Sequence, residues 1–377
     1  MMLGDGRPAW MVGAALASVL VIAGCDGQTY SLGINCLGLK GTDRDLQAAL
    51  DTQTQVVLCP RAIFTLDAPV ILRSPGNILE TLGRPTDPAE MATIILSANF
   101  SSLDVGIGAP ASNVHINSVR IDGNRRTLGP RGSRFQLLGM GIGNGYQLIN
   151  NVFADSPGWT HVHIIEPCDS SMIVGNIVEG GSQTHDATGN FSDGLSISCA
   201  HTLIANNVIN NVSSVGIVYF GGPGTIIRDN TISQTTNGAS SGINVGDAVR
   251  LDHTGVVISG NTIKATAPGY FDLGLAAGLR VWLPLPRQPN ITGITVTGNV
   301  ISGMSRYGLS VDGCLSCDIE NNQVVDWQPL TATPAAGCPP SAAYIANVSG
   351  GHADGNIQPG YVDANIDGCV GLPNAAP

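Results

Sequence analysis

A six-residue pattern with asparagine at its fourth position recurs eight times and restricts the fold more than any other feature of the chain. Each copy runs as an apolar residue, two further residues, asparagine, any residue and a second apolar residue. Successive asparagines are separated by 23 residues (Asn207 to Asn230) to 38 residues (Asn261 to Asn299), which suits one solenoid coil each, the longer intervals carrying loop insertions. The copies are VHINSV, LINNVF, IVGNIV, IANNVI, IRDNTI, ISGNTI, VTGNVI and IENNQV, with asparagines Asn117, Asn151, Asn176, Asn207, Asn230, Asn261, Asn299 and Asn322.

A second series of short apolar alternations lies between these patterns. Its members are GMGIG, GLSIS, GIVYF, GINVG, GLRVW and GLSVD, and THVHI takes the same place in one coil. Such alternation predicts strands, and the Gly, Asn and Asp clusters between them predict turns. Helical periodicity is clear only in TDRDLQAALD (42–51), where Thr42 and Asp45 suit a capping box.

The two series together predict a stacked β-solenoid. A single coil cannot bury its own apolar face, so the coils must stack and the ends must be capped. An inward asparagine amide at a bend can bond to backbone groups and to the amides one coil above and below. We therefore expect all eight asparagines to be structural.

This arrangement resembles the right-handed parallel β-helix of the pectin-lyase-like superfamily. DLQAALDTQTQVVLCPRAIFTLDAPVILRS resembles the opening helix and first coils of that group, and the resemblance covers about residues 38–327. It implies an all-β fold class, a right-handed parallel β-helix with a short N-terminal capping helix. We expect a β-helix domain over 25–327 and a C-terminal capping segment over 328–377. The superfamily includes lyases, hydrolases, epimerases and non-catalytic surface proteins, so fold alone does not define activity.

Alternation along the strands sorts their side chains into inward and outward columns. We expect one outward column to contain Gly141, His163, Ser196, Val218, Asn244, Arg280 and Ser310. The next would contain Gly143, Ile165, Ser198, Phe220, Gly246, Trp282 and Asp312. Polar groups and aromatic rings on one open face predict a groove in which an extended polymer could lie.

Comparison with polygalacturonases sharpens the candidate site. SDGLSIS resembles the aspartate strand of that family, so Asp193 matches one catalytic aspartate, and GLRVW resembles its arginine-lysine strand, so Arg280 matches a substrate-binding arginine. Val215 and Gly216 stand where the paired aspartates belong, and Ser241 stands where the histidine belongs. Inverting hydrolysis needs two carboxyl groups, so ordinary polygalacturonase activity is not expected.

Two functions remain open. The first is a carbohydrate-active enzyme, a lyase, hydrolase or epimerase, acting on an extended acidic polysaccharide. Asp193 would be its acid/base, with His163 or His185 assisting. We expect substrate contacts from Arg280, Trp282, Asn244, Ser196, Phe220 and Glu166. The second is a non-catalytic β-helix surface lipoprotein that binds glycans or another surface partner through the same groove.

The N-terminus resembles a bacterial lipoprotein signal. An apolar run, AWMVGAALASVLVIAG, follows Arg7 and ends in IAGC, so residues 1–24 would be removed and Cys25 would carry lipid. An ordinary secretory signal cleaved nearby is the alternative. Either reading predicts an extracytoplasmic protein, anchored to the membrane in the periplasm or at the cell surface in the first case and secreted in the second.

The cysteines fit an oxidising compartment. With Cys25 lipidated, eight remain, and their order suggests four sequential pairs. These are Cys36 with Cys59, Cys168 with Cys199, Cys314 with Cys317, and Cys338 with Cys369. The Cys314–Cys317 pair could instead be a redox or metal dithiol, but neither a second CxxC nor a histidine pair accompanies it.

Composition narrows the partners. Apolar residues make up 43% of the chain, charged residues 12%, and the net charge is −11, which excludes disorder and disfavours nucleic acid as a partner. Five arginines fall in 120–134 and could contact an acidic polymer from outside the groove. We expect a monomer and no structural metal, although DANIDG (363–368) matches the first half of a calcium loop.

Overall fold

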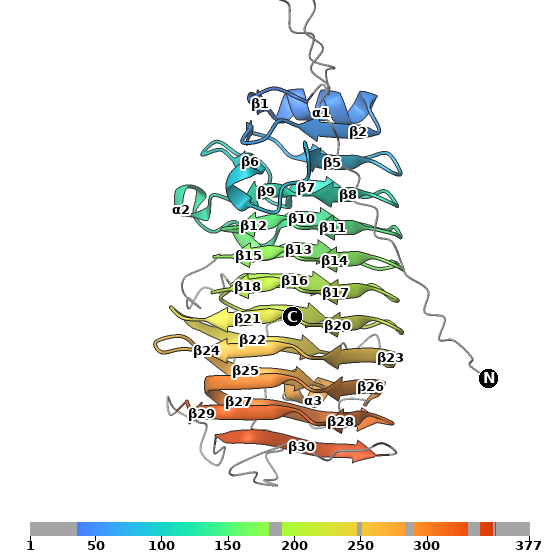
Figure 1. Cartoon of the computed structure of the whole chain (residues 1–377), viewed down its shortest axis with the longest axis vertical. Coiled ribbons are helices and arrows are strands. Elements are labelled where there is room, and N and C mark those ends of the chain that lie inside the picture. The colour runs from blue at the N-terminus through green and yellow to red at the C-terminus, as the bar shows by residue number, and fades with distance from the viewer. Residues whose placement is uncertain are drawn as a thin grey trace, which may run out of the picture. The chain divides into compact units, whose positions relative to one another are not determined.

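In the computed structural model the chain winds into a stack of coils whose strands all pair in parallel with the coil before and the coil after (Figure 1). The structure describes residues 36–180, 191–246, 251–282, 290–330, 340–349 and 351. Each coil contributes up to three strands, so the stack has three faces. The predicted fold class, an all-β right-handed parallel β-helix with a short N-terminal capping helix, is confirmed.

The faces are named here in chain order within a coil. Face one consists of β4 (Val70–Ile71), β7 (Val105–Ala109), β10 (Gly132–Met140), β13 (Gly158–Ile164), β16 (Asp193–Ile197), β19 (Val215–Tyr219), β22 (Gly238–Val245), β25 (Tyr270–Ala277), β27 (Val300–Leu315) and β30 (Ser341–Ser349). Face two consists of β2 (Gln55–Leu58), β5 (Ile78–Thr81), β8 (His115–Asn117), β11 (Gln147–Ile149), β14 (Met172–Val174), β17 (Leu203–Ala205), β20 (Ile226–Arg228), β23 (Asp252–Ser259), β26 (Ile291–Thr297) and β28 (Asp318–Glu320).

Face three consists of β1 (Lys40–Thr42), β3 (Ile63–Leu66), β6 (Ala92–Leu96), β9 (Val119–Asp122), β12 (Val152–Ala154), β15 (Ile177–Glu179), β18 (Val208–Asn210), β21 (Thr231–Gln234), β24 (Thr262–Ala265), the first residues of β27 and β29 (Gln323–Pro329). The described helical segments are α1 (Asp43–Thr52), η1 (Pro88–Glu90), α2 (Arg125–Leu128) and α3 (Leu279–Trp282). β30 pairs with β27 and adds a further strand within the 328–377 segment, where the sequence predicts only a cap.

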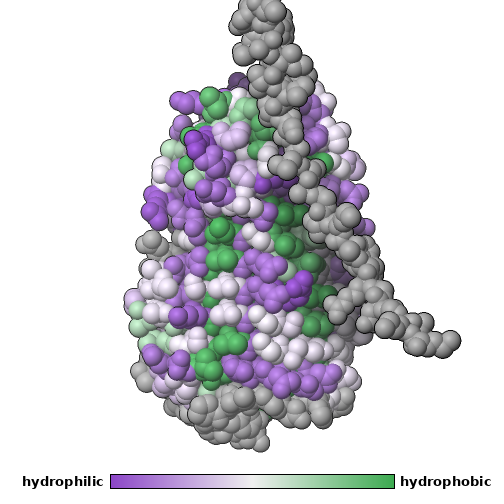
Figure 2. Space-filling model, viewed as in Figure 1, coloured by the Kyte–Doolittle hydropathy of each residue, from purple (hydrophilic) through white to green (hydrophobic). Residues whose placement is uncertain are grey.

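The core is built from columns of like side chains. On face two the register stacks Ile116, Leu148, Ile173, Ile204, Ile227, Ile258, Val296 and Ile319, all of them fully buried. On the outer surface, apolar side chains gather in narrow stripes with polar side chains between them (Figure 2). A parallel stack with a continuous apolar interior is thus what holds the coils together.

Helix α1 covers the first coil, as the sequence predicts (Figure 1). Thr42 and Asp45 form the predicted capping box, with the Thr42 amide donating to the Asp45 carboxylate at 2.8 Å. Leu46, Ala49 and Leu50 form its buried side. The helix closes an end of the stack that would otherwise expose apolar side chains and unpaired strand edges.

Seven of the eight predicted asparagines form one continuous ladder at the turn between faces two and three. Each Nδ2 donates to the Oδ1 of the next asparagine, at 2.8–3.0 Å from Asn151 through Asn322. Each Nδ2 also donates to a backbone carbonyl on the preceding coil, as Asn230 does to Ile204 at 2.9 Å. The amides are therefore satisfied within the core.

Asn117 is not part of this ladder, contrary to the prediction, although its side chain is buried and donates to Glu80 Oε2 at 3.4 Å. The register pairs Ile116 with Leu148 and Asn117 with Ile149, so Val119 stands at the ladder position of this coil. Only the Val119 backbone amide joins the ladder, donating to Asn151 Oδ1 at 3.1 Å. The VHINSV match places asparagine two residues before the true ladder position. The apolar pattern alone does not distinguish these two alignments, because both keep the same side chains inward.

Three disulfides tie neighbouring coils or a turn, in the pairs that the cysteine order predicts. They join Cys36 to Cys59, Cys168 to Cys199 and Cys314 to Cys317. Cys25, Cys338 and Cys369 lie outside the described residues. Within the described part of the chain, no helix is long and apolar enough to cross a membrane.

Candidate functional site

The outward column of face one differs from the prediction at two of its seven positions. Register places Gly139 beside His163, whereas Gly141 is expected there, and Ala276 beside Asn244, whereas Arg280 is expected. The observed order is Gly139, His163, Ser196, Val218, Asn244, Ala276 and Ser310. The other five positions, from His163 to Asn244 and at Ser310, are as predicted.

The predictions for Arg280 and Trp282 as strand residues are wrong. GLRVW forms α3 after the chain has left the sheet, and the strand of that coil is β25. Gly278 follows the strand where Trp282 is expected, and its amide donates to Val245. A Cβ at Gly278 would collide with the backbone of Asp312, so the chain has no room there for a tryptophan. The side chains of Arg280 and Trp282 lie outside the described part.

The prediction at GMGIG also slips by two residues. Leu138 and Met140 pair with Val162 and Ile164, so Ile142, expected to face inward, is 67% exposed. Two-residue slips keep inward and outward sides unchanged, which is why the apolar pattern permits them.

The outer side of face one is closed over its central coils. Ser196, Asn244 and Ser310 are each 0% exposed, while Phe220 is partly exposed. Over these described coils the face has no continuous open groove, contrary to expectation. A cavity is found at its N-terminal coils.

Asp193 opens β16 and is 5% exposed. Its Oδ1 accepts from the Val215 amide at 3.0 Å and its Oδ2 accepts from Ser196 Oγ at 3.1 Å. Ser196 Oγ lies 2.9 Å from Thr160 Oγ1, so the carboxylate joins three consecutive coils. These bonds are those of a residue that holds strand ends in register, and they occupy both oxygens of the predicted acid/base.

His161 is a buried histidine that sequence reasoning missed. Its Nδ1 lies 2.7 Å from the Asp193 carbonyl oxygen, and its Nε2 accepts from the Ser156 amide at 3.3 Å. Burial lowers the pKa of His161 to about 4, so the ring is neutral at pH 7. The position pairs with Gly194, where a Cβ would lie 2.4 Å from the Gly216 carbonyl oxygen and 3.1 Å from the Ile209 side chain.

His163 borders a cavity of about 310 Å³ on face one, which we call the His163 hollow. The ring packs edge-to-face on Trp159, with centroids 4.9 Å apart, and burial lowers the pKa of His163 to about 4. Two glycines let the side chains of Ile71 and Gln136 lie close against the backbone here, because a Cβ at Gly108 would lie 2.7 Å from Ile71 Cδ1 and one at Gly139 would lie 2.5 Å from Gln136 Oε1. The lining is Ile71, Asp104, Val105, Gly108, Ala109, Pro110, Gln136, Gly139, Met140, Gly141, His163 and Ile165.

Trp159 lies four residues before His163 in the same strand, and GWTHVHI shows that spacing. The sequence around Gly108, Gly139 and Gln136 shows no comparable pattern. Their place in the hollow depends on residues from neighbouring coils.

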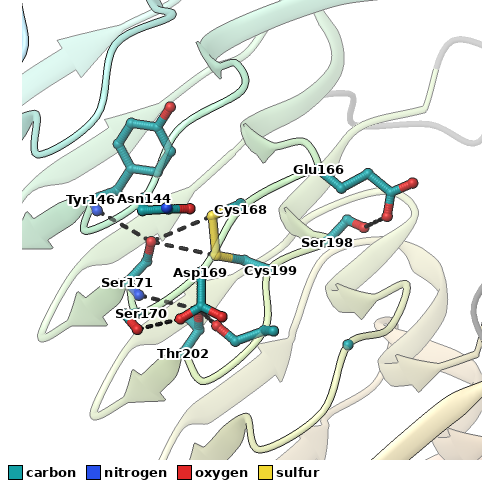
Figure 3. Close-up of a disulfide and its surroundings, with 12 residues drawn as sticks. Asn144, Tyr146, Glu166, Cys168, Asp169, Ser170, Ser171, Ser198, Cys199 and Thr202 are labelled. Carbon is teal, nitrogen blue, oxygen red and sulfur yellow. Dashed lines mark hydrogen bonds between the residues drawn. A yellow bond between two sulfur atoms is a disulfide. The ribbon is translucent and has the colours of Figure 1, made fainter.

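Glu166, which follows β13, is fixed against the next coil (Figure 3). Ser198 Oγ donates to Glu166 Oε2 at 3.0 Å, and the Cys168–Cys199 disulfide joins the same two coils. Ser171 Oγ accepts from the Tyr146 amide at 3.2 Å and lies 3.5 and 3.4 Å from the two sulfurs. The disulfide thus joins the two coils that carry Glu166 and Ser198. The partly exposed Glu166 carboxylate is held near the end of β13, the strand that carries His163.

The remaining predicted groups have no described geometry. His185 and the calcium-like segment 363–368 lie outside the described residues. Among the residues that the structure describes, no group of three or more His, Cys, Asp or Glu side chains is arranged to hold a metal ion.

Comparisons with known proteins find resemblance in structure only. No protein-family model matches the chain, and no curated protein matches it. A solved alginate lyase from Paenibacillus sp. str. FPU-7 is 13% identical, with 82% of this chain and 98% of that chain covered and a TM-score of 0.46. Endopolygalacturonase I from Stereum purpureum is 15% identical (84% and 98% covered, TM-score 0.43), and the mannuronan C-5 epimerase A-module from Azotobacter vinelandii is 12% identical (84% and 94% covered, TM-score 0.40). At such identities the similarity concerns the fold alone.

Proposed function

We propose that this protein acts on an extended, acidic polysaccharide that binds in the His163 hollow. The observation that carries the proposal is the hollow itself, a space bordered by His163, whose ring packs on Trp159, on a face whose central coils are closed. Flat rings beside hydrogen-bonding groups suit a sugar, whose faces are apolar and whose edge is polar. His163 supplies the ring, and Gln136 supplies the amide.

Acidic sugars also need a cation. Arg134 is exposed and lies two residues before Gln136 in β10, so it is the arginine of the 120–134 cluster that we assign to a uronate carboxylate. An arginine presents a planar fork of donors that suits a carboxylate.

The proposed chemistry begins with removal of the C5 proton of a uronate, the step that lyases and epimerases share. We assign the proton acceptor to His163, because its low pKa keeps the imidazole unprotonated at neutral pH. Asp193, whose two oxygens accept bonds from Val215 and Ser196, is assigned to positioning β16. Hydrolysis with Asp193 as the acid is the less favoured reaction.

A non-catalytic glycan-binding protein is the second candidate. It is favoured by the same low pKa of His163, since a weakly basic imidazole is a poor proton acceptor. The two candidates share a site and differ in whether the bound glycan changes.

The test uses the mature chain with uronate polysaccharides. Ultraviolet absorbance would report the unsaturated product of a lyase, new reducing ends would report hydrolysis, and proton NMR would report epimerisation. We expect His163→Gln to abolish the reaction. His201→Gln, an exposed histidine on the neighbouring coil paired with Asp169, should leave it unchanged. If all three assays are silent while uronate binding depends on His163, the non-catalytic function is correct. If no uronate polymer binds, both fail.

We also propose that the protein is extracytoplasmic and anchored to a membrane through a lipid on Cys25, with simple secretion as the alternative. The cysteine context IAGC and the pairing of six cysteines in disulfides support it. Expression in a bacterial host with labelled fatty acid should label the wild type and leave Cys25→Ala unlabelled. Label in both forms, or in neither, would refute the anchor.

A further inference from the structure

Face three carries a larger cavity than the His163 hollow, on a different side of the stack. About 600 Å³ in volume, it lies where the strands of this face end and the chain turns toward face one. We call it the face-three trough. Its lining is Arg120, Arg126, Ala154, Asp155, Glu179, Gly180, Asn210, Asn211, Ser233, Thr235, Thr236 and Asn237.

The trough runs across several coils. Its residues come from β9, β12, β15, β18 and β21 and from the turns that follow them. Neighbouring strands lie about 4.8 Å apart, so five coils span about 19 Å. This length suits a chain of several repeating units better than a single small molecule.

A small side chain makes the trough deep at one end. Register stacks Asp122, Ala154 and Glu179, and Arg120 reaches over the buried Ala154 to Glu179. Arg120 Nη1 donates to Glu179 Oε1 at 3.0 Å, and its Nη2 donates to Asp122 Oδ2 at 3.4 Å. The guanidinium is thereby fixed in place before any ligand binds.

Asp155 is held in a similar way. Arg126 Nε lies 3.3 Å from Asp155 Oδ2. Gly180, at φ 76°, brings its backbone so near Asp155 that a Cβ there would collide with the carboxylate. Among the described residues of the lining there are thus two arginines and two carboxylates, and their charges cancel.

The other end of the trough is uncharged. Ser233 Oγ donates to Asn210 Oδ1 at 2.6 Å, and the Thr235 amide and hydroxyl donate to Asn211 Oδ1 at 2.8 and 3.1 Å. With both oxygens occupied, each carboxamide is fixed in orientation and has an NH₂ group left to donate. Fixed donors and acceptors lower the entropy cost of binding a polar ligand.

We propose that the face-three trough binds an uncharged oligosaccharide. Balanced charge gives no attraction to a polyanion, and paired amide, hydroxyl and carboxylate groups match the vicinal hydroxyls of neutral sugars. This site is separate from the His163 hollow in residues, face and ligand charge, and it does not depend on the function proposed for that hollow.

The test measures binding of cellohexaose, mannohexaose and laminarihexaose to the full mature chain by calorimetry, with oligogalacturonate as the acidic probe. We expect at least one neutral hexasaccharide to bind, with affinity falling about tenfold in Ser233→Ala and in Glu179→Gln, as for loss of one or two hydrogen bonds. Thr231→Ala is the matched control, because Thr231 is exposed on the same strand outside the trough. His163→Gln should leave neutral binding unchanged, which separates this proposal from the other.

Three results would overturn it. Absence of binding by all three neutral hexasaccharides is the first. The second is equal weakening by Thr231→Ala and Ser233→Ala, and the third is displacement of the neutral probe by oligogalacturonate at comparable concentration.

Discussion

The asparagine ladder and the outer column of face one are both stacks of one side chain per coil, but they follow opposite rules. From Asn151 to Asn322 the ladder repeats one residue, and each amide makes the same bonds as its neighbours. The outer column changes at every coil, from glycine to histidine, serine, valine, asparagine and alanine.

The difference separates residues that hold the stack from residues available for other tasks. An inward amide has no water to replace a missing partner, so every coil must supply the same group. Among the described residues the outer column has no such network running from coil to coil, although Ser196, Asn244 and Ser310 are buried too. Variation along the outer column is thus where binding groups can be placed, and the His163 hollow occurs where that column has two glycines and a histidine.

The largest effect is expected from breaking the middle of the ladder. Asn230→Ala removes two bonds that the Asn230 amide donates and two that its oxygen accepts from Asn207, leaving buried groups without partners. We expect a loss of about 4 kcal/mol in the free energy of unfolding, measured with urea. Asn117→Ala is the control, because Asn117 lies outside the ladder, and it should cost about 1 kcal/mol. Equal losses would mean that the ladder is not a cooperative network.

The Cys168–Cys199 disulfide should have the next largest effect. It closes a loop with a sequence separation of 31, and Cys168→Ala with Cys199→Ala should cost about 3.5 kcal/mol by loop entropy. The Cys314–Cys317 disulfide, with a separation of 3, should contribute much less. Thermal unfolding of both double variants under non-reducing conditions gives the comparison. Similar losses in the two would contradict the entropic explanation.

The fold could be predicted because it depends on repetition. Each coil repeats the same apolar and asparagine positions. A wrong alignment of one copy therefore does not change the fold that the other copies predict. Asn117 shows where prediction from repetition fails. Its VHINSV pattern has the residue types of the repeat but lies two residues out of register. Only the pairing of Ile116 with Leu148, a contact between coils, reveals the slip.

The candidate site was harder to predict because it depends on where each coil leaves the sheet. GLAA in β25 and GLRVW in α3 both begin with glycine and leucine, and the sequence predicts the strand of this coil at GLRVW. Gly274 is the residue that indicates GLAA as the strand. It stacks between Gly242 and Gly308, at a position where a Cβ would meet the backbone of the next coil. The hollow could not be predicted at all, since its walls come from separate coils.

A pH effect distinguishes the buried histidine of this face from ordinary surface histidines. The pKa of His161 is lowered from 6.5 to about 4 in the folded protein, so below pH 6.5 the unfolded chain binds a proton that the folded chain does not. The stabilising contribution is complete above pH 6.5 and is lost as the pH falls toward 4, by about 3 kcal/mol. Urea unfolding at pH 4.5 and pH 7 should give a shallower pH dependence for His161→Gln than for the wild type. An unchanged slope would show that His161 is not the group responsible.

The smallest effect on stability, and the sharpest separation of the two kinds of position, is expected at glycine. A Cβ at Gly139 would lie 2.5 Å from Gln136 Oε1, the end of a flexible side chain, and should shift the free energy of unfolding by less than about 1 kcal/mol. A Cβ at Gly216 would lie 2.5 Å from the Gly242 carbonyl, which is backbone that the next coil holds in place, and should cost about 3 kcal/mol. The order reverses for ligand binding, because Gly139→Ala displaces the Gln136 side chain that lines the His163 hollow, whereas Gly216 lies outside that lining. If calorimetry with a uronate oligosaccharide finds Gly139→Ala binding as well as the wild type, the hollow is not the binding site, whatever the stability of the variant.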